Sequence, residues 1–420
     1  MSKVALIGLG YVGLSVAAAF SRAGYDLIGF DTDETRIAEI VSGIDRTDQV
    51  AREDLLRLAP LVTSDLTRLE GADVYVVIVQ TTLTPDKQPD TTAVEQVATM
   101  IAPFIRPDVL VVLSSTVPIG FTLGRFLPLL EAGSGLEAGT DFDLGFAPER
   151  FDPGNRINTL SSITKIVSGL DDRSLRRTGD LYRPVVESIV EAASIPVAEA
   201  SRVIENAQRD VNLAFVNDVA HILDAWRIDT ADVLTVARTK WNFLPFRPGL
   251  VGGHCIPVHP HYLRQAAIDK DVSPSLIASA RQTNEDMPKR IADVCIARLE
   301  RLPATVTVLG LSYKEDVPDV RGSAAMEIVR DLLARGCQVQ LVDPLVEPQD
   351  LERAFGLRPT PEDEREAGDA VILAVAHRPF VEAGWPLIMR HLHAGAGLVL
   401  DVRGVLPREK RPAGVDLWRL

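Results

Sequence analysis

The sequence is poor in cysteine and in positive charge. Its three cysteines, Cys255, Cys295 and Cys337, lie far apart and form no C-x-x-C pair, so nothing indicates a disulfide framework, and a reducing cytoplasm is the expected location. Lysine and arginine number 44 against 58 aspartate and glutamate residues, which leaves a net charge of −14. This deficit argues against nucleic acid or an anionic membrane as the main partner.

Long apolar runs are also missing. No stretch of about 18 uninterrupted apolar residues occurs, so we expect no membrane span. The opening residues, MSKVALIGLGYVGLSVAAAF, imitate a signal peptide, but their glycines and the following DLIGFDTD favour a buried strand and helix. A chain of 420 residues is too long for one hydrophobic core, which predicts two or three domains.

One α/β pattern occurs near each end of the chain. In the first half, apolar strands and helices alternate over the ranges 3–10, 11–24, 25–33, 72–80, 91–104 and 108–116. The same order recurs over the ranges 304–312, 323–336, 337–344, 368–377 and 396–404. Continuous apolar strands of this kind are typical of parallel sheets buried on both faces. We therefore predict an α/β protein with two Rossmann-like, doubly wound domains.

The region between these two patterns is helical in character. Residues 198–228 contain neither proline nor glycine, and as a single helix they would extend for more than about 40 Å. Such a helix suits a spine between domains and a homodimer interface, although two shorter helices with a kink remain an alternative. The predicted domains are residues 1–196, a central helical dimerisation domain over residues 197–298, and residues 299–420.

A glycine-rich turn follows the first predicted strand. Gly8, Gly10 and Gly13 form the pattern G-x-G-x-x-G, in which the glycines permit a tight turn, the approach of a pyrophosphate and close packing of helix on strand. Asp31 ends the next strand, where its carboxylate would accept hydrogen bonds from an adenosine ribose. These features predict NAD as the cofactor rather than NADP, and only Arg36 offers a partner for a 2′-phosphate.

The second α/β pattern lacks this turn. GLSYKEDVPDVRGS stands in its place and carries Lys314 and Arg321, which could hold a different phosphate ester or could be solvated surface charges.

The stretch GGHCIPVHP, residues 252–260, contains Cys255, which could be a nucleophile, a metal ligand or a core residue. Gly252 and Gly253 expose the backbone before Cys255 and leave room for a ligand, which would suit a nucleophilic thiolate. The neighbouring histidines could instead form a metal site with Cys255, or the thiol could be a small core residue. Cys295 and Cys337 lie in apolar settings typical of core positions.

Several long motifs resemble the UDP-glucose/GDP-mannose dehydrogenase family over essentially the whole chain. They are GLGYVGL (8–14), SSTVPIG (114–120), FAPERFDPGN (146–155), ENAQRDVNLAFVND (205–218), PGLVGGHCIPVHPHYL (248–263), ARQTNEDMP (280–288), LGLSYKEDVPDVRGS (309–323) and DVRG (401–404). The forms PER, ENAQRDVN and GGHCIP look most like the branch that oxidises UDP-N-acetylhexosamines. The resemblance implies an N-terminal NAD domain, a central helical dimer spine and a C-terminal nucleotide-sugar domain.

The resemblance also implies a reaction, the oxidation of the sugar's C6 alcohol to a carboxylate with reduction of two NAD. Cys255 matches the cysteine that forms a thiohemiacetal and then a thioester, which favours the nucleophile over the metal ligand. Thr116 and Glu149 match residues that position water or act as a base, and Asn206 matches an oxyanion-stabilising asparagine.

The expected binding residues form two sets. The cofactor set consists of Gly8, Gly10, Tyr11, Val12, Gly13, Asp31, Arg36, Thr81, Thr116 and Arg321. The nucleotide-sugar set consists of Glu149, Arg150, Arg202, Asn206, Arg209, Gly252, Arg281, Lys314 and Arg403, with UDP as the expected nucleotide and no metal.

Two departures from the family pattern fall on the expected catalytic machinery. Arg202 stands where the family has a catalytic lysine, and His259 stands where it has an aspartate. Arginine cannot release a proton as lysine can, whereas histidine can be neutral or cationic near neutral pH. A second group of departures comprises Gln80, Thr82, Ser114 and Gly322. A working 6-dehydrogenase with Arg202 and His259 as a changed acid–base pair is the main hypothesis. The alternatives are a single oxidation, an epimerisation, or a non-catalytic nucleotide-sugar binder.

Overall fold

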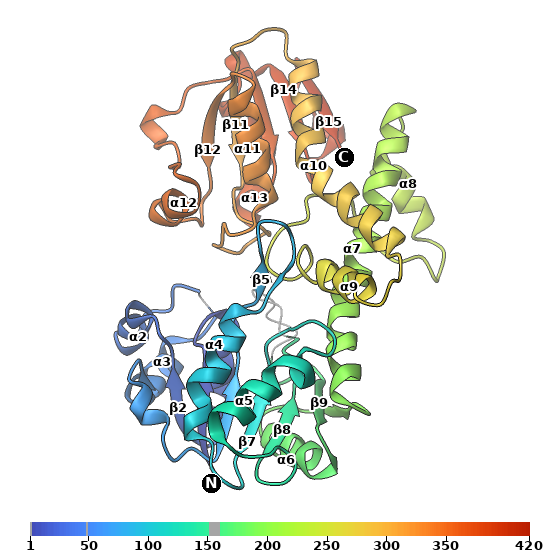
Figure 1. Cartoon of the computed structure of the whole chain (residues 1–420). Helices are drawn as coiled ribbons and strands as arrows, with labels where there is room; N and C mark the ends of the chain where they lie inside the picture. The colour runs from blue at the N-terminus through green and yellow to red at the C-terminus, as the bar shows by residue number, and fades with distance from the viewer. Residues whose placement is uncertain (1, 48, 151–159) are drawn as a thin grey trace. The chain divides into compact units, whose positions relative to one another are not determined.

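The structure is a computed structural model that describes residues 2–47, 49–150 and 160–420 (Figure 1). Contacts between residues divide the chain into two compact units. Unit 1 comprises Met1–Glu205 and His261–Ser273, and unit 2 comprises Asn206–Pro260 and Pro274–Leu420. Helices α7 (Ile195–Ala225) and α9 (His259–Ile268) each contribute residues to both units. The three-part division made from the sequence stays a prediction.

Unit 1 is built on one eight-stranded sheet with the order β10-β9-β8-β7-β4-β1-β2-β3. Its strands are β1 (Lys3–Ile7), β2 (Asp26–Phe30), β3 (Val62–Thr63), β4 (Val74–Val77), β7 (Leu110–Leu113), β8 (Asp143–Phe146), β9 (Lys165–Gly169) and β10 (Ile189–Glu191). Neighbouring strands pair in parallel except β8 and β9, which are antiparallel. A separate antiparallel hairpin joins β5 (Thr82–Leu83) to β6 (Pro89–Asp90).

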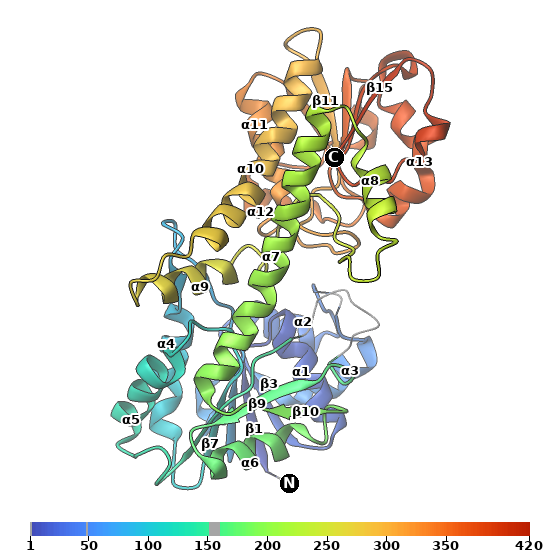
Figure 2. The ribbon, with the colours of Figure 1, turned by 90° about the vertical axis from the view of Figure 1, so that its right-hand side faces the viewer.

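Helices cover both faces of this sheet, as Figure 2 shows from the side. They are α1 (Tyr11–Arg22), α2 (Glu34–Val41), α3 (Arg52–Leu58), α4 (Thr92–Ile101), α5 (Leu127–Ser134) and α6 (Asp172–Tyr182). Alternate residues of β1 divide between two cores, because successive side chains of a strand point to opposite faces. Leu6 packs in the core that contains α1, and Ile7 packs in the core that contains α4.

Unit 2 contains a five-stranded, fully parallel sheet with the order β12-β11-β13-β14-β15. The strands are β11 (Thr305–Leu309), β12 (Gln338–Val342), β13 (Ala370–Leu373), β14 (Gly397–Asp401) and β15 (Val415–Arg419). The helices of this unit include α8 (Thr230–Ala237), α10 (Ser275–Arg298), α11 (Ala324–Ala334), α12 (Pro348–Phe355) and α13 (Arg378–Arg390). α10 and α11 cover one face of the sheet, and α13 covers the other.

These sheets confirm the two Rossmann-like halves, and most predicted elements match an observed one. The predicted strands are longer than the observed ones: residues 72–80 give only Val74–Val77, because the chain leaves the ladder where the polar loop begins. Residues 198–225 of the predicted stretch lie in one continuous helix, α7, instead of two helices with a kink, and residues 226–228 lie beyond its end. Over the part of the chain that the structure describes, no helix combines the length and apolarity that crossing a bilayer would require.

Candidate functional site

The glycine turn at the end of β1 has the geometry that its spacing predicts. Gly8 adopts φ +99°, and a Cβ atom on it would lie 2.2 Å from the carbonyl oxygen of Ile78. A Cβ atom on Gly13 would lie 1.8 Å from the carbonyl oxygen of Gly8, whereas one on Gly10 would meet nothing within 4 Å. Gly8 and Gly13 are therefore required by packing, and Gly10 leaves open space at the start of α1, where a phosphate group would be favoured.

Asp31 and Arg36 both contact this turn. Asp31 accepts hydrogen bonds from the backbone N–H groups of Leu9 (2.7 Å) and Asp33 (2.9 Å), which fix its carboxylate just beyond β2. Arg36 is only 3% exposed, donates from Nε to the Leu9 carbonyl (2.8 Å) and forms an ion pair with Asp45 (2.9 Å). The Arg36 guanidinium thus stabilises the turn through the Leu9 carbonyl. A 2′-phosphate would have to compete with Asp45 for this guanidinium.

Thr81 and Thr116 are linked directly, because the Thr81 hydroxyl donates to the Thr116 carbonyl (2.7 Å). The loop after Thr116 is held by Glu199 of α7, whose carboxylate accepts from the backbone N–H groups of Gly120 (2.5 Å) and Thr122 (2.8 Å). Burial raises the pKa of Glu199, and these hydrogen bonds oppose that shift. The long helix therefore positions the segment that carries Thr116.

Two predicted binding arginines of unit 1 contact protein groups around Glu149. Glu149 is 8% exposed, and its carbonyl oxygen accepts a hydrogen bond from Nε of Arg202 (2.6 Å). Arg150 pairs with Glu205 (2.8 Å) and donates to the Thr164 carbonyl (2.9 Å). Arg202 thus anchors the backbone of Glu149 from α7. The rest of this motif, residues 151–155, lies outside the described residues.

The cysteine loop of unit 2 packs tightly against the segment that replaces the second glycine turn. A Cβ atom on Gly252 would lie 2.7 Å from the Gly322 carbonyl oxygen, and one on Gly253 would lie 2.6 Å from the Tyr313 ring. The expectation that these glycines leave room for a ligand is wrong, since protein atoms fill the space beside them. Gly322 itself has φ +65° and faces Gly253, which explains a glycine where the family has glutamate.

Two of the arginines expected to bind phosphate, Arg321 and Arg403, form ion pairs with carboxylates near the cysteine loop. Arg321 forms an ion pair with Asp319 (2.8 Å), which also contacts Nε2 of His254 (3.1 Å). Burial works to raise the pKa of Asp319, but hydrogen bonds from His254 and Arg321 outweigh it and hold the pKa well below its usual range. Arg403 pairs with Glu315 (2.8 Å), and Lys314 lies in the same loop, half-buried. Asp319 thereby ties the cysteine loop to the Arg321 segment.

Cys255 is half-buried and lies four residues before α9, which begins at His259. The Cys255 carbonyl accepts a hydrogen bond from the His259 backbone N–H (3.0 Å), which places the two residues one turn apart. Nδ1 of His259 lies 2.5 Å from the side-chain amide nitrogen of Asn206, and both side chains are buried. The structure therefore brings Asn206 and His259, predicted from separate motifs, into contact.

The other two cysteines are core residues, as predicted. Burial and the neighbouring Cys337 raise the pKa of Cys295 to about 12. Cys337 is also buried, in the same core cluster. Among the described residues, which include His254, Cys255, His259 and His261, no three His, Cys, Asp or Glu side chains gather into a metal-binding group.

Two further predicted binding residues lie on helices of unit 2. Arg281 is 5% exposed and forms a buried ion pair with Asp210, which also accepts a hydrogen bond from Asn284 (2.8 Å). Arg209 is exposed on α7. Arg281 thus joins α10 to α7.

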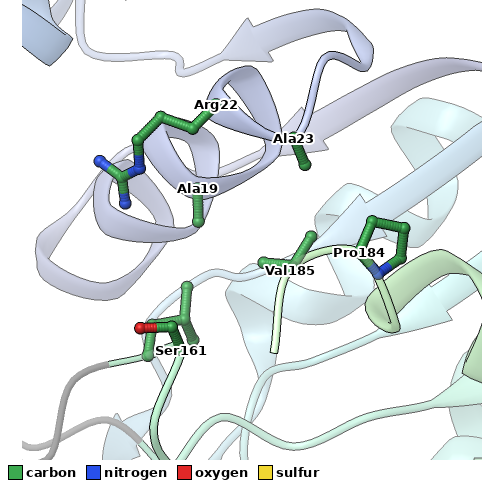
Figure 3. A pocket seen from close by; sticks show the side chains of 7 residues that line it. Ala19, Arg22, Ala23, Ser161, Pro184 and Val185 are labelled. Carbon is green, nitrogen blue, oxygen red and sulfur yellow. The ribbon is translucent and has the colours of Figure 1, made fainter. Parts of the chain in front are cut away.

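None of the predicted site residues lines the pocket of unit 1 that Figure 3 shows. Its volume is about 260 Å³, and its lining consists of Ala19, Arg22, Ala23, Leu160, Ser161, Pro184 and Val185. It adjoins the C-terminal end of α1, opposite the glycine turn at the N-terminal end of that helix, and Arg22 pairs with Asp54 (2.6 Å). The pocket therefore belongs to neither the predicted cofactor site nor the cysteine loop.

Comparison with known proteins decides the family. Family models for the NAD binding domain, the central domain and the UDP binding domain match residues 2–186, 196–286 and 307–408. The chain belongs to the UDP-glucose/GDP-mannose dehydrogenase family. It is 39% identical over 415 residues to the UDP-N-acetyl-D-glucosamine 6-dehydrogenase of Pseudomonas aeruginosa, covering 97% of this chain and 98% of that protein.

Other members of the family are similar over the same length. The UDP-N-acetyl-D-mannosamine dehydrogenase of Pyrococcus horikoshii is 31% identical over 418 residues, covering 96% of both chains. Its solved structure has a TM-score of 0.89 at 30% identity, covering 99% of this chain and 98% of that one. The UDP-N-acetyl-mannosamine dehydrogenase Cap5O of Staphylococcus aureus gives a TM-score of 0.85 at 26% identity, covering 100% and 98%.

Membership of this family fixes the general activity. The protein is an NAD-dependent dehydrogenase that acts on a CH–OH group of a nucleotide sugar, and its predicted cofactor, NAD, is confirmed. The roles of individual site residues stay predictions.

Three further residues had no role predicted from the sequence, namely Glu199, Lys165 and Tyr262. Tyr262 is buried, and its hydroxyl donates a hydrogen bond to the Thr82 carbonyl (3.1 Å). Of these three residues, only Glu199 had a sequence signal, because it lies three residues before Arg202, the position at which the family has its catalytic lysine.

Proposed function

We propose that this protein oxidises the C6 alcohol of a UDP-N-acetylhexosamine to a uronate, with two NAD reduced per sugar. The observation that carries the proposal is Cys255, a half-buried thiol one helical turn from His259 and its contact with Asn206. The whole-length likeness to dehydrogenases named for UDP-N-acetylglucosamine and UDP-N-acetylmannosamine supports the choice of sugar.

Cys255 supplies the covalent chemistry in this proposal. After the first oxidation its thiolate adds to the C6 aldehyde to give a thiohemiacetal, whose oxidation gives a thioester. NAD held at the turn of Gly8, Gly10 and Gly13 would supply the hydride acceptor for both oxidations. Water then cleaves the thioester, releasing the uronate and returning the thiol. The second N–H of the Asn206 amide, beyond the one facing His259, is left to stabilise the oxyanion of the tetrahedral stages.

Arg202 and His259 take roles that fit their chemistry rather than those of the family's lysine and aspartate. Arg202 keeps its charge throughout and holds the Glu149 backbone, so we assign it to positioning and electrostatic stabilisation. With the Asn206 amide donating to Nδ1, neutral His259 carries its proton on Nε2. In that state His259 offers a hydrogen-bond donor, so we assign the proton-accepting role to Glu149.

A substrate panel tests the proposal. Purified protein is incubated with NAD and UDP-glucose, UDP-GlcNAc, UDP-GalNAc or UDP-ManNAc, and NADH is followed at about 340 nm while products are identified by mass spectrometry. We expect two NADH per sugar and a uronate with an N-acetylated substrate, and at least about tenfold lower kcat/KM with UDP-glucose. One NADH per sugar with an aldehyde product, or an isomerised sugar without net NADH, would contradict the four-electron reaction.

We also propose that the protein is a cytoplasmic homodimer whose interface includes the exposed face of α7. Phe215 and Ile222 are 60% and 59% exposed, and their spacing of seven residues places them on one face of α7. Trp226, which is 75% exposed, directly follows the helix. Exposed apolar side chains in such a row are typical of protein interfaces. The absence of cysteine pairing among the three free cysteines fits a reducing compartment.

Substitution of the α7 face tests the dimer. Phe215→Glu combined with Ile222→Glu is expected to shift the mass in solution to that of a monomer, because two carboxylates would be buried at the interface. The control is Val381→Glu, which places the same charge on an exposed apolar position of α13. Light scattering after gel filtration measures the mass, and an unchanged dimer in the double variant would exclude this face.

A further inference from the structure

Lys165 lies outside every predicted site, yet the structure places its ammonium group against the Glu149 carboxylate. We propose that Lys165 is a positioning residue, which holds the Glu149 carboxylate in place for the proton transfers of the oxidation. The inference rests on the proposed function, since it requires Glu149 to contact the reacting groups.

The contact fixes the carboxylate on two sides. Nζ of Lys165 lies 2.8 Å from Oε2 of Glu149, with 2% and 9% of the two side chains exposed. Oε1 accepts a hydrogen bond from the backbone N–H of Arg150 (3.0 Å). These two contacts fall on different oxygens of the same carboxylate, one from a side-chain cation and one from a backbone N–H. The orientation of the carboxylate is therefore fixed from two sides.

The lysine is itself held in a single place. Its Nζ lies 4.5 Å from the ring centroid of Tyr182, a cation–π contact from α6. The Tyr182 hydroxyl is 2.9 Å from the hydroxyl of Ser114, and the Ser114 carbonyl accepts from the Glu149 backbone N–H (3.3 Å). β7, β9 and α6 therefore all contribute to the same buried cluster.

Ser114 gives the cluster its charge balance. A carboxylate at this position would compete with Glu149 for the Lys165 ammonium group. A neutral hydroxyl brings no second charge, so the Lys165–Glu149 pair is one cation and one anion. Burial of such a pair is tolerated only when both charges are compensated and hydrogen-bonded, and both conditions are met here.

Two different residues hold Glu149, one at its backbone and one at its side chain. The position of the carboxylate can therefore be disturbed without releasing the backbone. Arg202 holds its backbone carbonyl (2.6 Å), whereas Lys165 holds its carboxylate (2.8 Å). Loss of the lysine would leave the backbone anchored and release only the carboxylate. A change at Lys165 should consequently alter the acid–base step more than the binding of either ligand.

A double-mutant cycle on the full-length protein tests the proposal. We expect Lys165→Met to lower kcat about 10- to 100-fold with KM for NAD changed less than about twofold. Lys165→Arg keeps the charge and should retain most of the activity. In a variant that already carries Glu149→Gln, adding Lys165→Met should not lower kcat any further.

Tyr182→Phe is the matched control, since it removes the hydroxyl contact with Ser114 while leaving a ring beside Nζ, and it should keep near-normal kcat. Thermal unfolding and NAD titration verify that each variant is folded; if Lys165→Met does not fold, Lys165→Gln, which retains a donor for Oε2, replaces it in the cycle. Equal losses from the lysine change in both backgrounds would show a structural role and overturn the proposal. If Glu149→Gln keeps full activity, the positioning role fails while the oxidation measured with the substrate panel still stands.

Discussion

Replacement of Cys255 by serine or alanine is expected to lower uronate formation by about a thousandfold or more, a barrier increase of about 4 kcal/mol. A thioester requires a sulfur that attacks as a thiolate and later leaves, and neither a hydroxyl nor a methyl group can replace it. Cys255 is half-buried and lies four residues before the start of α9, unlike the two buried core cysteines.

The control for this prediction is Cys295→Ala. Cys295 is fully buried, and its thiol, with a pKa raised to about 12 by burial, is a poor nucleophile. This variant is expected to lose stability through the cavity it leaves but to keep two NADH per sugar. Mass spectrometry of the quenched reaction should place an acyl group on the peptide that contains Cys255. Normal NADH stoichiometry in Cys255→Ala would contradict the covalent mechanism.

Gly13→Ala is expected to destroy the cofactor turn. The added Cβ atom would lie 1.8 Å from the Gly8 carbonyl oxygen, so α1 would have to move away from β1. We expect a loss of about 3 kcal/mol in the free energy of unfolding, together with loss of NAD binding. Thermal unfolding and a fluorescence titration with NAD measure the two effects.

Gly10→Ala separates packing from cofactor approach. A Cβ atom at Gly10 meets nothing within 4 Å, so the unfolding temperature should stay near that of the unchanged protein. NAD affinity should still fall, because the methyl group occupies the open space beside the start of α1 where the pyrophosphate is expected. If Gly13→Ala unfolds normally and binds NAD as tightly as the unchanged protein does, the role of the turn is wrong.

Local patterns in the sequence were enough to predict the two parallel sheets and the glycine turn. The strands of each half are short apolar runs, and the 3.6-residue period of α7 is uninterrupted by proline or glycine within residues 198–228. The spacing of Gly8, Gly10 and Gly13 lies within one βαβ unit and predicted the turn, whereas only the fold shows Ile78 packed against Gly8. The strands from β8 to β10 were not predicted individually, because their runs of three to five residues carry little periodic signal.

The candidate site was predicted less completely, because its contacts join residues distant in the chain. Gly252 and Gly253 looked like space for a ligand, and only the fold shows Tyr313 and Gly322 against them. Lys165 begins an apolar strand and had no motif to mark it. Its pairing with Glu149 exists because β9 and the loop after β8 are brought together.

The sequence by itself determined the two Rossmann-like halves, the helix between the patterns and NAD as the cofactor, whereas Cys255 as the reactive thiol stays a prediction. Each of these depends on the order of residues within one or two neighbouring elements. The tertiary structure alone decided how the charged and polar side chains are paired. Arg36 lies beneath the cofactor turn, Lys165 meets Glu149, and Asn206 meets His259. Such pairs form because a buried charge or amide must find a partner, and packing, rather than sequence spacing, selects which partner is near.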